Sequence, residues 1–145
     1  MTRWLLMVCM GLLAGCSSFS FPIPRFSLPD TDGPEAVWVA PAIVLLVRRE
    51  CPAADCLLVL AGDDDTPLDK AVADGLRRAG MAVLRQPDKG EVPAGAEKLR
   101  FGLSTDDNGA YLRVVLGHVV LAQFFPRRKN KGFGAGHAVT RWEKA

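Results

Sequence analysis

KLRFGLSTDDNGAYLRVVLGHVVLAQFF, residues 98–125, carries the clearest strand pattern in the chain. Leu99, Phe101 and Leu103 alternate with polar or small residues, which is typical of a strand that buries one face. The DNG triplet at 107–109 favours a tight hairpin turn, after which an apolar run leads back along the first strand. A second turn, at Gly117 and His118, leads into a third apolar run at residues 119–125. The segment therefore predicts an antiparallel meander.

A helix is predicted upstream of the meander. Thr66 is a suitable N-cap, Pro67 fits the first helical position, and Asp69 favours the positive end of the helix dipole. Gly80 is the expected left-handed residue just beyond the end of the helix. Small and apolar residues recur on one face, namely Leu68, Ala71, Val72, Gly75, Leu76 and Ala79. This face is expected to pack against the sheet.

Other apolar runs complete the expected fold. Residues 57–60 and 81–84 flank the helix and predict two short strands, the first of them buried, and residues 137–142 predict a closing strand. Residues 42–50 fit both a β-branched strand and one helical face, so their pattern leaves the choice open. We predict an α+β domain in which a small, mainly antiparallel sheet of three to five strands has one or two helices packed on one face.

The N-terminus is typical of a bacterial lipoprotein signal. Arg3 precedes a short apolar run, and the residues LAG at 13–15 lead directly into Cys16. Small side chains before a cysteine suit signal peptidase II, and the cysteine thiol would then receive the diacylglyceryl group. The alternatives are an ordinary secretory signal and a short membrane anchor. We expect residues 1–15 to be a signal peptide and Cys16 to be lipidated.

A proline-rich segment follows the signal. Residues 16–35 contain four prolines, which resist helix and sheet and suit an extended tether, so the folded domain is expected over residues 36–145. Ser17 after the cysteine favours the periplasmic face of the outer membrane over retention at the inner membrane. An alternative to a simple leash is an added strand on a partner's sheet edge, for which the nearly alternating residues are Phe19, Phe21, Ile23 and Phe26.

Cys51 and Cys56 are predicted to form a disulfide. Cys9 would leave with the signal and Cys16 would carry lipid, so these two thiols remain to pair in an oxidising periplasm. A metal site is the rival interpretation, but no histidine or second cysteine pair is near in sequence. A catalytic pair usually has the tighter Cys-X-X-Cys spacing.

The charge is unevenly distributed, although the net formal charge of the whole chain is only +2. A basic, glycine-rich stretch at 127–136 predicts a flexible loop that faces anionic lipid or an acidic partner. The candidate contact residues are Arg127, Arg128, Lys129 and Lys131. Their spread along the chain implies no ordered groove for nucleic acid, so we predict no nucleic-acid partner.

No catalytic pattern is recognisable in the sequence. The chain has two histidines and no HExxH metal motif, phosphate-binding loop or GxSxG nucleophile elbow. His118 and His137 are expected to be solvent-exposed polar residues. We therefore predict a protein without enzymatic activity, catalytic residues, a metal site or a cofactor.

The order of several short segments is also informative. The Cys16 signal and the proline-rich leader are followed by CPAADCLLVL at 51–60, LRRAGMAV at 76–83, YLRV at 111–114 and VTRWE at 139–143. In this order the chain resembles the TrbH family of conjugal transfer lipoproteins. It departs from the family pattern in the cysteine pair, in the basic run, and in CPA at 51–53 where the family usually has Pro-Pro-Ala.

The resemblance implies a non-enzymatic outer-membrane component of the mating-pair apparatus of a type IV secretion system, acting in assembly with protein partners. It also implies a helix over residues 42–50. The alternative function is that of a stand-alone envelope accessory lipoprotein that binds a lipid or a small ligand. That alternative requires an apolar cavity between the sheet and the helices.

Overall fold

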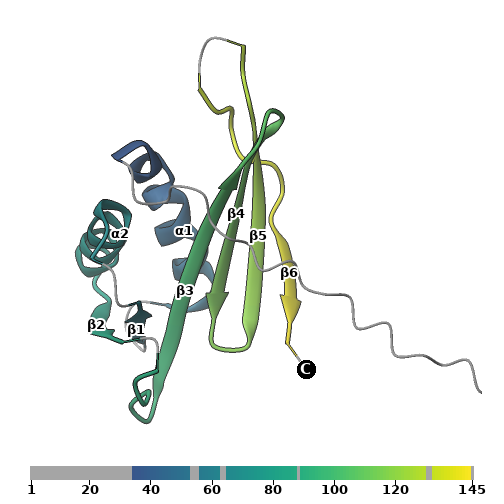
Figure 1. The fold of residues 1–145 in the computed structure, drawn as a ribbon. Helices are drawn as coiled ribbons and strands as arrows, with labels where there is room; N and C mark the ends of the chain where they lie inside the picture. Colours follow the sequence, from purple (N-terminus) through teal and green to yellow (C-terminus); the bar gives the residue numbers. More distant parts are fainter. Residues whose placement is uncertain (1–33, 53–55, 63–64, 88, 130–131, 145) are drawn as a thin grey trace, which may run out of the picture.

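The computed structural model describes residues 34–52, 56–62, 65–87, 89–129 and 132–144. Their secondary structure begins with a 3₁₀ helix and ends with a short strand (Figure 1). In chain order the elements are η1 (Pro34–Val39), α1 (Ala40–Glu50), β1 (Leu57–Ala61), α2 (Pro67–Arg78), β2 (Ala82–Gln86), β3 (Ala96–Thr105), β4 (Gly109–Leu116), β5 (Val119–Pro126) and β6 (Thr140–Glu143).

The strands form a six-stranded sheet in the order β2-β1-β3-β4-β5-β6. The predicted meander is present, because β3, β4, β5 and β6 pair antiparallel in sequence order. β1 instead pairs parallel with both β2 and β3. A parallel neighbour requires a crossover, and α2 provides it between β1 and β2. The α+β prediction is confirmed, with one strand more than the upper number expected.

The helices lie against one face of this sheet (Figure 1). Side chains of η1, α1 and α2 form a continuous apolar core with alternate residues of the strands. None of the buried side chains in the described residues is polar or charged. Completely burying one leucine or isoleucine stabilises a fold by about 1.5–3 kcal/mol. The large core residues with no more than 1% exposure are Ile43, Leu58, Leu68, Leu76, Leu99 and Leu112.

α2 has the ends that its sequence predicts. The Thr66 hydroxyl accepts a hydrogen bond from the Asp69 amide at 3.1 Å, and the Asp69 carboxylate accepts one from the Thr66 amide at 3.2 Å. This reciprocal pair satisfies two backbone donors that a helix start leaves without partners. Gly80 has a φ of 86°, in the left-handed region that glycine adopts without strain. Both ends of the helix are thus fixed by local sequence.

Residues 42–50, whose pattern left helix and strand open, belong to α1. Ile43, Leu46 and Val47 are buried on one side of it, toward the sheet and α2. The two helices approach closely at Gly75, where an added Cβ would lie 2.7 Å from Cγ2 of Val44. Packing against the sheet and α2 therefore selects the helix, which local propensity alone did not distinguish from a strand.

The closing strand differs from its predicted range. Residues 137–139 are irregular, and β6 covers only Thr140–Glu143, all four exposed. Arg141 connects β6 to α1. Its Nε atom donates a hydrogen bond to Oε2 of Glu50 at 3.0 Å. Hydrogen bonding to Glu50, and then to Glu143, raises the pKa of Arg141. The short edge strand thus depends on a polar contact with α1 as well as on its pairing with β5.

The capping pair at the start of α2 can be tested by stability measurements. We expect Thr66→Ala to lower the free energy of unfolding by about 1 kcal/mol, because the amide of Asp69 loses its acceptor. Thr66→Ser keeps a hydroxyl there and should remain close to wild type. Urea denaturation followed by far-ultraviolet circular dichroism measures both. Equal stability of the alanine and serine variants would contradict the assignment.

Candidate functional site

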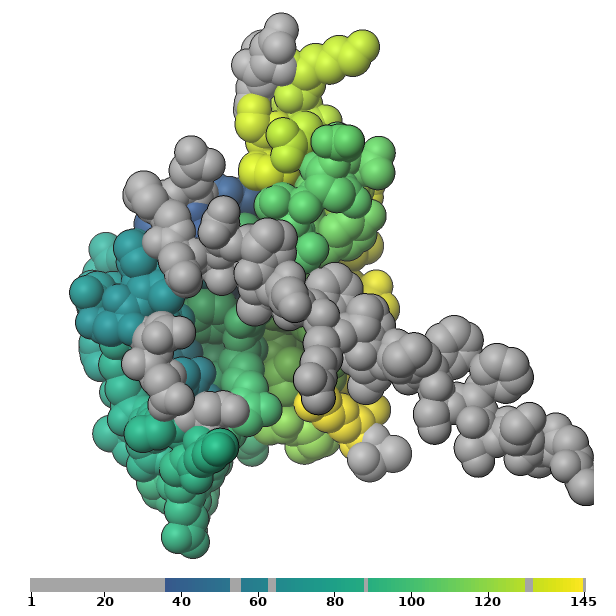
Figure 2. Space-filling model, viewed as in Figure 1, coloured from purple at the N-terminus to yellow at the C-terminus, as the bar shows by residue number. Residues whose placement is uncertain are grey.

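The most prominent surface feature is the basic arm, which we define as residues 127–136. Its described parts extend beyond the end of β5 and project from the top of the molecule in Figure 2. Arg127 and Phe133 form an isolated antiparallel bridge, and the Arg128 amide donates to the Gly132 carbonyl at 2.8 Å. The Gly134 amide donates to the Pro126 carbonyl at 2.7 Å. The arm therefore begins as a hydrogen-bonded continuation of the β5 end of the sheet, in a segment for which the sequence predicted a flexible loop.

An aromatic cluster supports the base of the arm. The ring of Trp38 stacks on Phe133 with centroids 4.7 Å apart, and meets Phe125 edge-on at 5.2 Å. Trp38 belongs to η1, the first element that the structure describes. Aromatic pairs of this geometry add roughly 0.5–1.5 kcal/mol beyond the area they bury. The arm is thus attached to the element that directly follows the proline-rich segment.

The cations of the arm are exposed. Arg127, Arg128 and Lys129 are all solvent-exposed, and the guanidinium carbon of Arg127 lies 5.4 Å from the ring centroid of Phe133. Lys131, the fourth predicted contact residue, lies outside the described residues. A hollow of about 540 Å³ separates the arm from the β3–β4 turn, where Asp107 and Asn108 line it. This arrangement can bind an anionic surface by charge, and its lining includes no histidine, cysteine or serine.

Cys16 and the whole predicted signal also lie outside the described residues, as does most of the tether. Within the part of the chain that the structure covers, no helix is long and apolar enough to cross a membrane. The lipid anchor therefore remains a prediction from the sequence.

The structure joins Cys51 and Cys56 in a disulfide, with their Cα atoms 5.8 Å apart. Cys51 directly follows α1 as its C-cap, and its amide donates to the Val47 carbonyl at 2.8 Å. Cys56 is buried immediately before β1, so the bridge connects the end of a helix to the start of an interior strand of the sheet. Both cysteines are used in this link, which is consistent with a structural role.

The histidines are separated from one another and exposed. His118 lies in the β4–β5 turn, and His137 follows the arm with its ring 5.4 Å from that of Phe124. Among the described residues, no group of three or more histidine, cysteine, aspartate or glutamate side chains is arranged to hold a metal ion.

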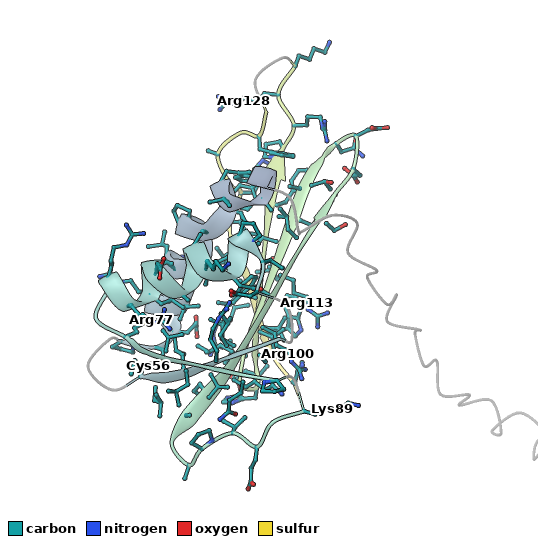
Figure 3. All side chains as sticks on the ribbon, turned by 60° about the vertical axis from the view of Figure 1, so that its left-hand side comes forward. Cys56, Arg77, Lys89, Arg100, Arg113 and Arg128 are labelled. Carbon is teal, nitrogen blue, oxygen red and sulfur yellow. A yellow bond between two sulfur atoms is a disulfide. The ribbon has the colours of Figure 1, made fainter. Side chains whose placement is uncertain are left out.

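The face of the sheet opposite the helices carries cations that sequence reasoning did not single out. Figure 3 shows Arg100 and Arg113 on this face, and the register places Lys98 on it as well. Each of these residues falls at an outward position in an alternating strand, which usually indicates a solvated side chain. Only the pairing of β3 with β4 shows that they gather on one surface.

A second hollow, of about 550 Å³, lies between the two helices. Its lining includes Val44, Leu45 and Gly75, with Arg48 and Arg78 among the charged members. No strand residue lines it, so it is a surface groove and not a cavity between sheet and helices. The space where an accessory lipoprotein would hold its ligand is instead occupied by core side chains.

The family model described as conjugal transfer protein TrbH matches residues 25–143, which include every helix and strand described above. Neither a curated protein nor a solved structure matches the chain significantly.

Removal of the disulfide is expected to weaken the domain without abolishing its fold. Closing a loop of about six residues contributes roughly 2 kcal/mol through the entropy of the unfolded chain. We expect the double variant Cys51→Ala and Cys56→Ala to lose about this amount in urea denaturation. Wild-type protein treated with a reductant should show the same loss. A fully stable double variant would contradict a structural role for the bridge.

Proposed function

The chain belongs to the TrbH family of conjugal transfer proteins, and from this premise we propose that it is a non-enzymatic, lipid-anchored assembly component of the mating-pair apparatus of a type IV secretion system. The observation that carries the proposal is the family match over nearly the whole folded domain. Apolar side chains fill the space between the helices and the sheet, so contacts with other molecules have to form on the outer surface of the domain. This supports an assembly role.

We place the protein at the periplasmic face of the outer membrane. The support comes from the sequence, in which Cys16 ends a lipoprotein signal and Ser17 follows it. Several acyl chains on one cysteine would each contribute about 0.8 kcal/mol per buried CH₂ group, which makes release from the membrane very slow. The domain would then search for partners only within the reach of its tether.

The basic arm is the contact surface that we assign to this assembly role. Phe133 of the arm stacks on Trp38, which is three residues beyond the end of the tether at residue 35, so the arm lies close to the point where the tether enters the domain. Cations at this end can bind anionic headgroups or an acidic protein of the apparatus. Each exposed ion pair contributes only about 0–1 kcal/mol, so the arm acts through several charges together.

The anchor can be tested directly. Cys16→Ser removes the thiol that would receive the diacylglyceryl group, so we expect the variant to incorporate no radiolabelled palmitate. Wild-type protein should be labelled and should fractionate with the outer membrane. The variant Cys9→Ser, altered inside the predicted signal, is the matched control and should be labelled like wild type. Equal labelling of the Cys16 variant would exclude lipidation at this residue.

Conjugation assays test the assembly role. Deleting the gene should lower the frequency of conjugative transfer, and the wild-type gene should restore it. Reversing the four arm charges together, at Arg127, Arg128, Lys129 and Lys131, should restore transfer less well at equal protein level, because the cations act collectively. A deletion strain that mates at the parental rate would overturn the proposed function.

The control for the arm uses four exposed cations elsewhere on the domain. They are Arg48, Arg49, Lys89 and Lys144, and their reversal changes the net charge by the same amount. This variant should restore transfer like wild type. An equal defect in both variants would show that transfer responds to net charge and not to the arm.

A further inference from the structure

The edge strand β6 has the features of a strand that can accept a partner. It is the last strand in the order of the sheet, so within the described residues no strand lies on its outer side (Figure 1). All four of its residues, Thr140–Glu143, are exposed, and Trp142 keeps 41% of its surface. An exposed edge presents backbone donors and acceptors that another strand can use. β6 is therefore a candidate site for strand addition.

The pairing of β6 with β5 determines which backbone groups point outward. The Lys144 amide donates to the His118 carbonyl at 2.8 Å, on the β5 side. Hydrogen-bonded and non-hydrogen-bonded residues alternate along an antiparallel strand, so Trp142, two residues earlier, also directs its amide and carbonyl to β5. Arg141 and Glu143 direct theirs to the open edge of the sheet.

The sequence of β6 is complementary to itself in one antiparallel register. When two copies pair about a two-fold axis at Trp142, Arg141 of each copy lies opposite Glu143 of the other. These are the residues whose backbone groups face outward, so each such pair can form two backbone hydrogen bonds. The two Trp142 residues then form the non-hydrogen-bonded pair, in which side chains are closer together. Charge and backbone direction thus select the same register.

The side chains on both faces of β6 suit this register. Arg141 and Glu143 share the helix side, where Nη2 of Arg141 lies 3.1 Å from Oε1 of Glu143 and Nε binds Glu50. Because the Arg141 and Glu143 side chains remain 46% and 57% exposed, a second copy can add its carboxylate without displacing Glu50. Four charges of alternating sign would then lie side by side. On the other face the two Trp142 rings would form a cross-strand aromatic pair, a contact that stabilises sheets.

The opposite edge of the sheet is blocked within the chain. On β2 the Gln86 carbonyl accepts from the Gly62 amide on the β1 side, so the Val83 carbonyl, three residues earlier, faces the open side. Nη2 of Arg77 donates to this Val83 carbonyl at 3.4 Å. Charged side chains commonly protect an edge strand from pairing. The contrast favours β6 as the edge that pairs.

We propose that two copies of this chain pair edge to edge through β6, about a two-fold axis at Trp142, and form one continuous sheet. Four residues a side make an interface well below the standard size of about 800 Å² per partner, so the dimer should be weak in dilute solution. Anchoring on a shared membrane would raise the effective concentration and favour it. The pairing goes beyond the proposed function and depends neither on conjugation nor on lipid at Cys16.

Disulfide crosslinking of the purified, processed chain tests the register. In a non-hydrogen-bonded pair the two Cα atoms lie about 4.5 Å apart, within the range that a disulfide spans. Trp142→Cys should therefore form a covalent homodimer on oxidation with diamide, detected by non-reducing electrophoresis and identified by mass spectrometry. Cys51 and Cys56 are already joined to each other, and the wild-type chain treated in the same way gives the background.

Thr140→Cys is the matched control for position. This residue is also exposed on β6, but in the proposed register its two copies are offset by four residues, about 14 Å at about 3.4 Å per residue. A disulfide cannot span this distance, so the variant should stay at the wild-type background.

A charge reversal tests the ion pairs. Glu143→Arg, added to Trp142→Cys, places like charges opposite each other at both pairs and keeps the Arg141–Glu50 contact. We expect the initial rate of crosslinking to fall about tenfold, which corresponds to about 1.4 kcal/mol of lost pairing free energy. Glu91→Arg in the same background makes the same charge change at an exposed residue of the β2–β3 loop and should leave the rate unchanged.

Three outcomes would overturn the proposal. One is crosslinking of Trp142→Cys that does not exceed the wild-type background. Another is equal crosslinking of Trp142→Cys and Thr140→Cys, which would show random collision. The third is an unchanged rate after Glu143→Arg. If circular dichroism shows that Glu143→Arg does not fold, the comparison of the two cysteine positions decides alone. Transfer assays test the proposed function separately, so the failure of one is distinguishable from the failure of the other.

Discussion

The structure depends on covering the apolar face of one sheet. Leu99, Leu112 and Leu121 on β3, β4 and β5 have almost no exposed surface, and among the described residues it is the two helices and η1 that lie over them. Within the described residues, all three helices pack on this one face. The basic arm continues beyond the end of β5, and Arg100 and Arg113 lie on the face of the sheet opposite the helices.

Features that arise from neighbouring residues were predictable. The meander follows from alternation and turn residues, and α2 follows from the Thr66 cap and the Gly80 stop. α1 was not decided, because Ile43 and Val47 satisfy both periodicities and only packing on α2 selects the helix. β1 was expected as a strand, but its parallel pairing with β2 and β3 joins residues distant in sequence.

The candidate contact surfaces also depend on contacts between residues that are distant in sequence. The arm was visible as a run of charges, whereas its support by Trp38 was not, because Trp38 and Phe133 are nearly a hundred residues apart. The cations on the face opposite the helices were missed for a related reason. Arg100 and Arg113 each look like an ordinary outward residue in an alternating strand, and only the β3–β4 register brings them to one surface.

The helical segment from η1 through α1 is attached to the sheet at both ends. At its start, Trp38 contacts Phe125 and Phe133 near the end of β5. At its end, Glu50 binds Arg141 on β6, and Cys51 is bonded to Cys56 before β1. The two ends of this helical segment are therefore fixed by different interactions, aromatic contacts with Phe125 and Phe133 at its start and a covalent bond at its end.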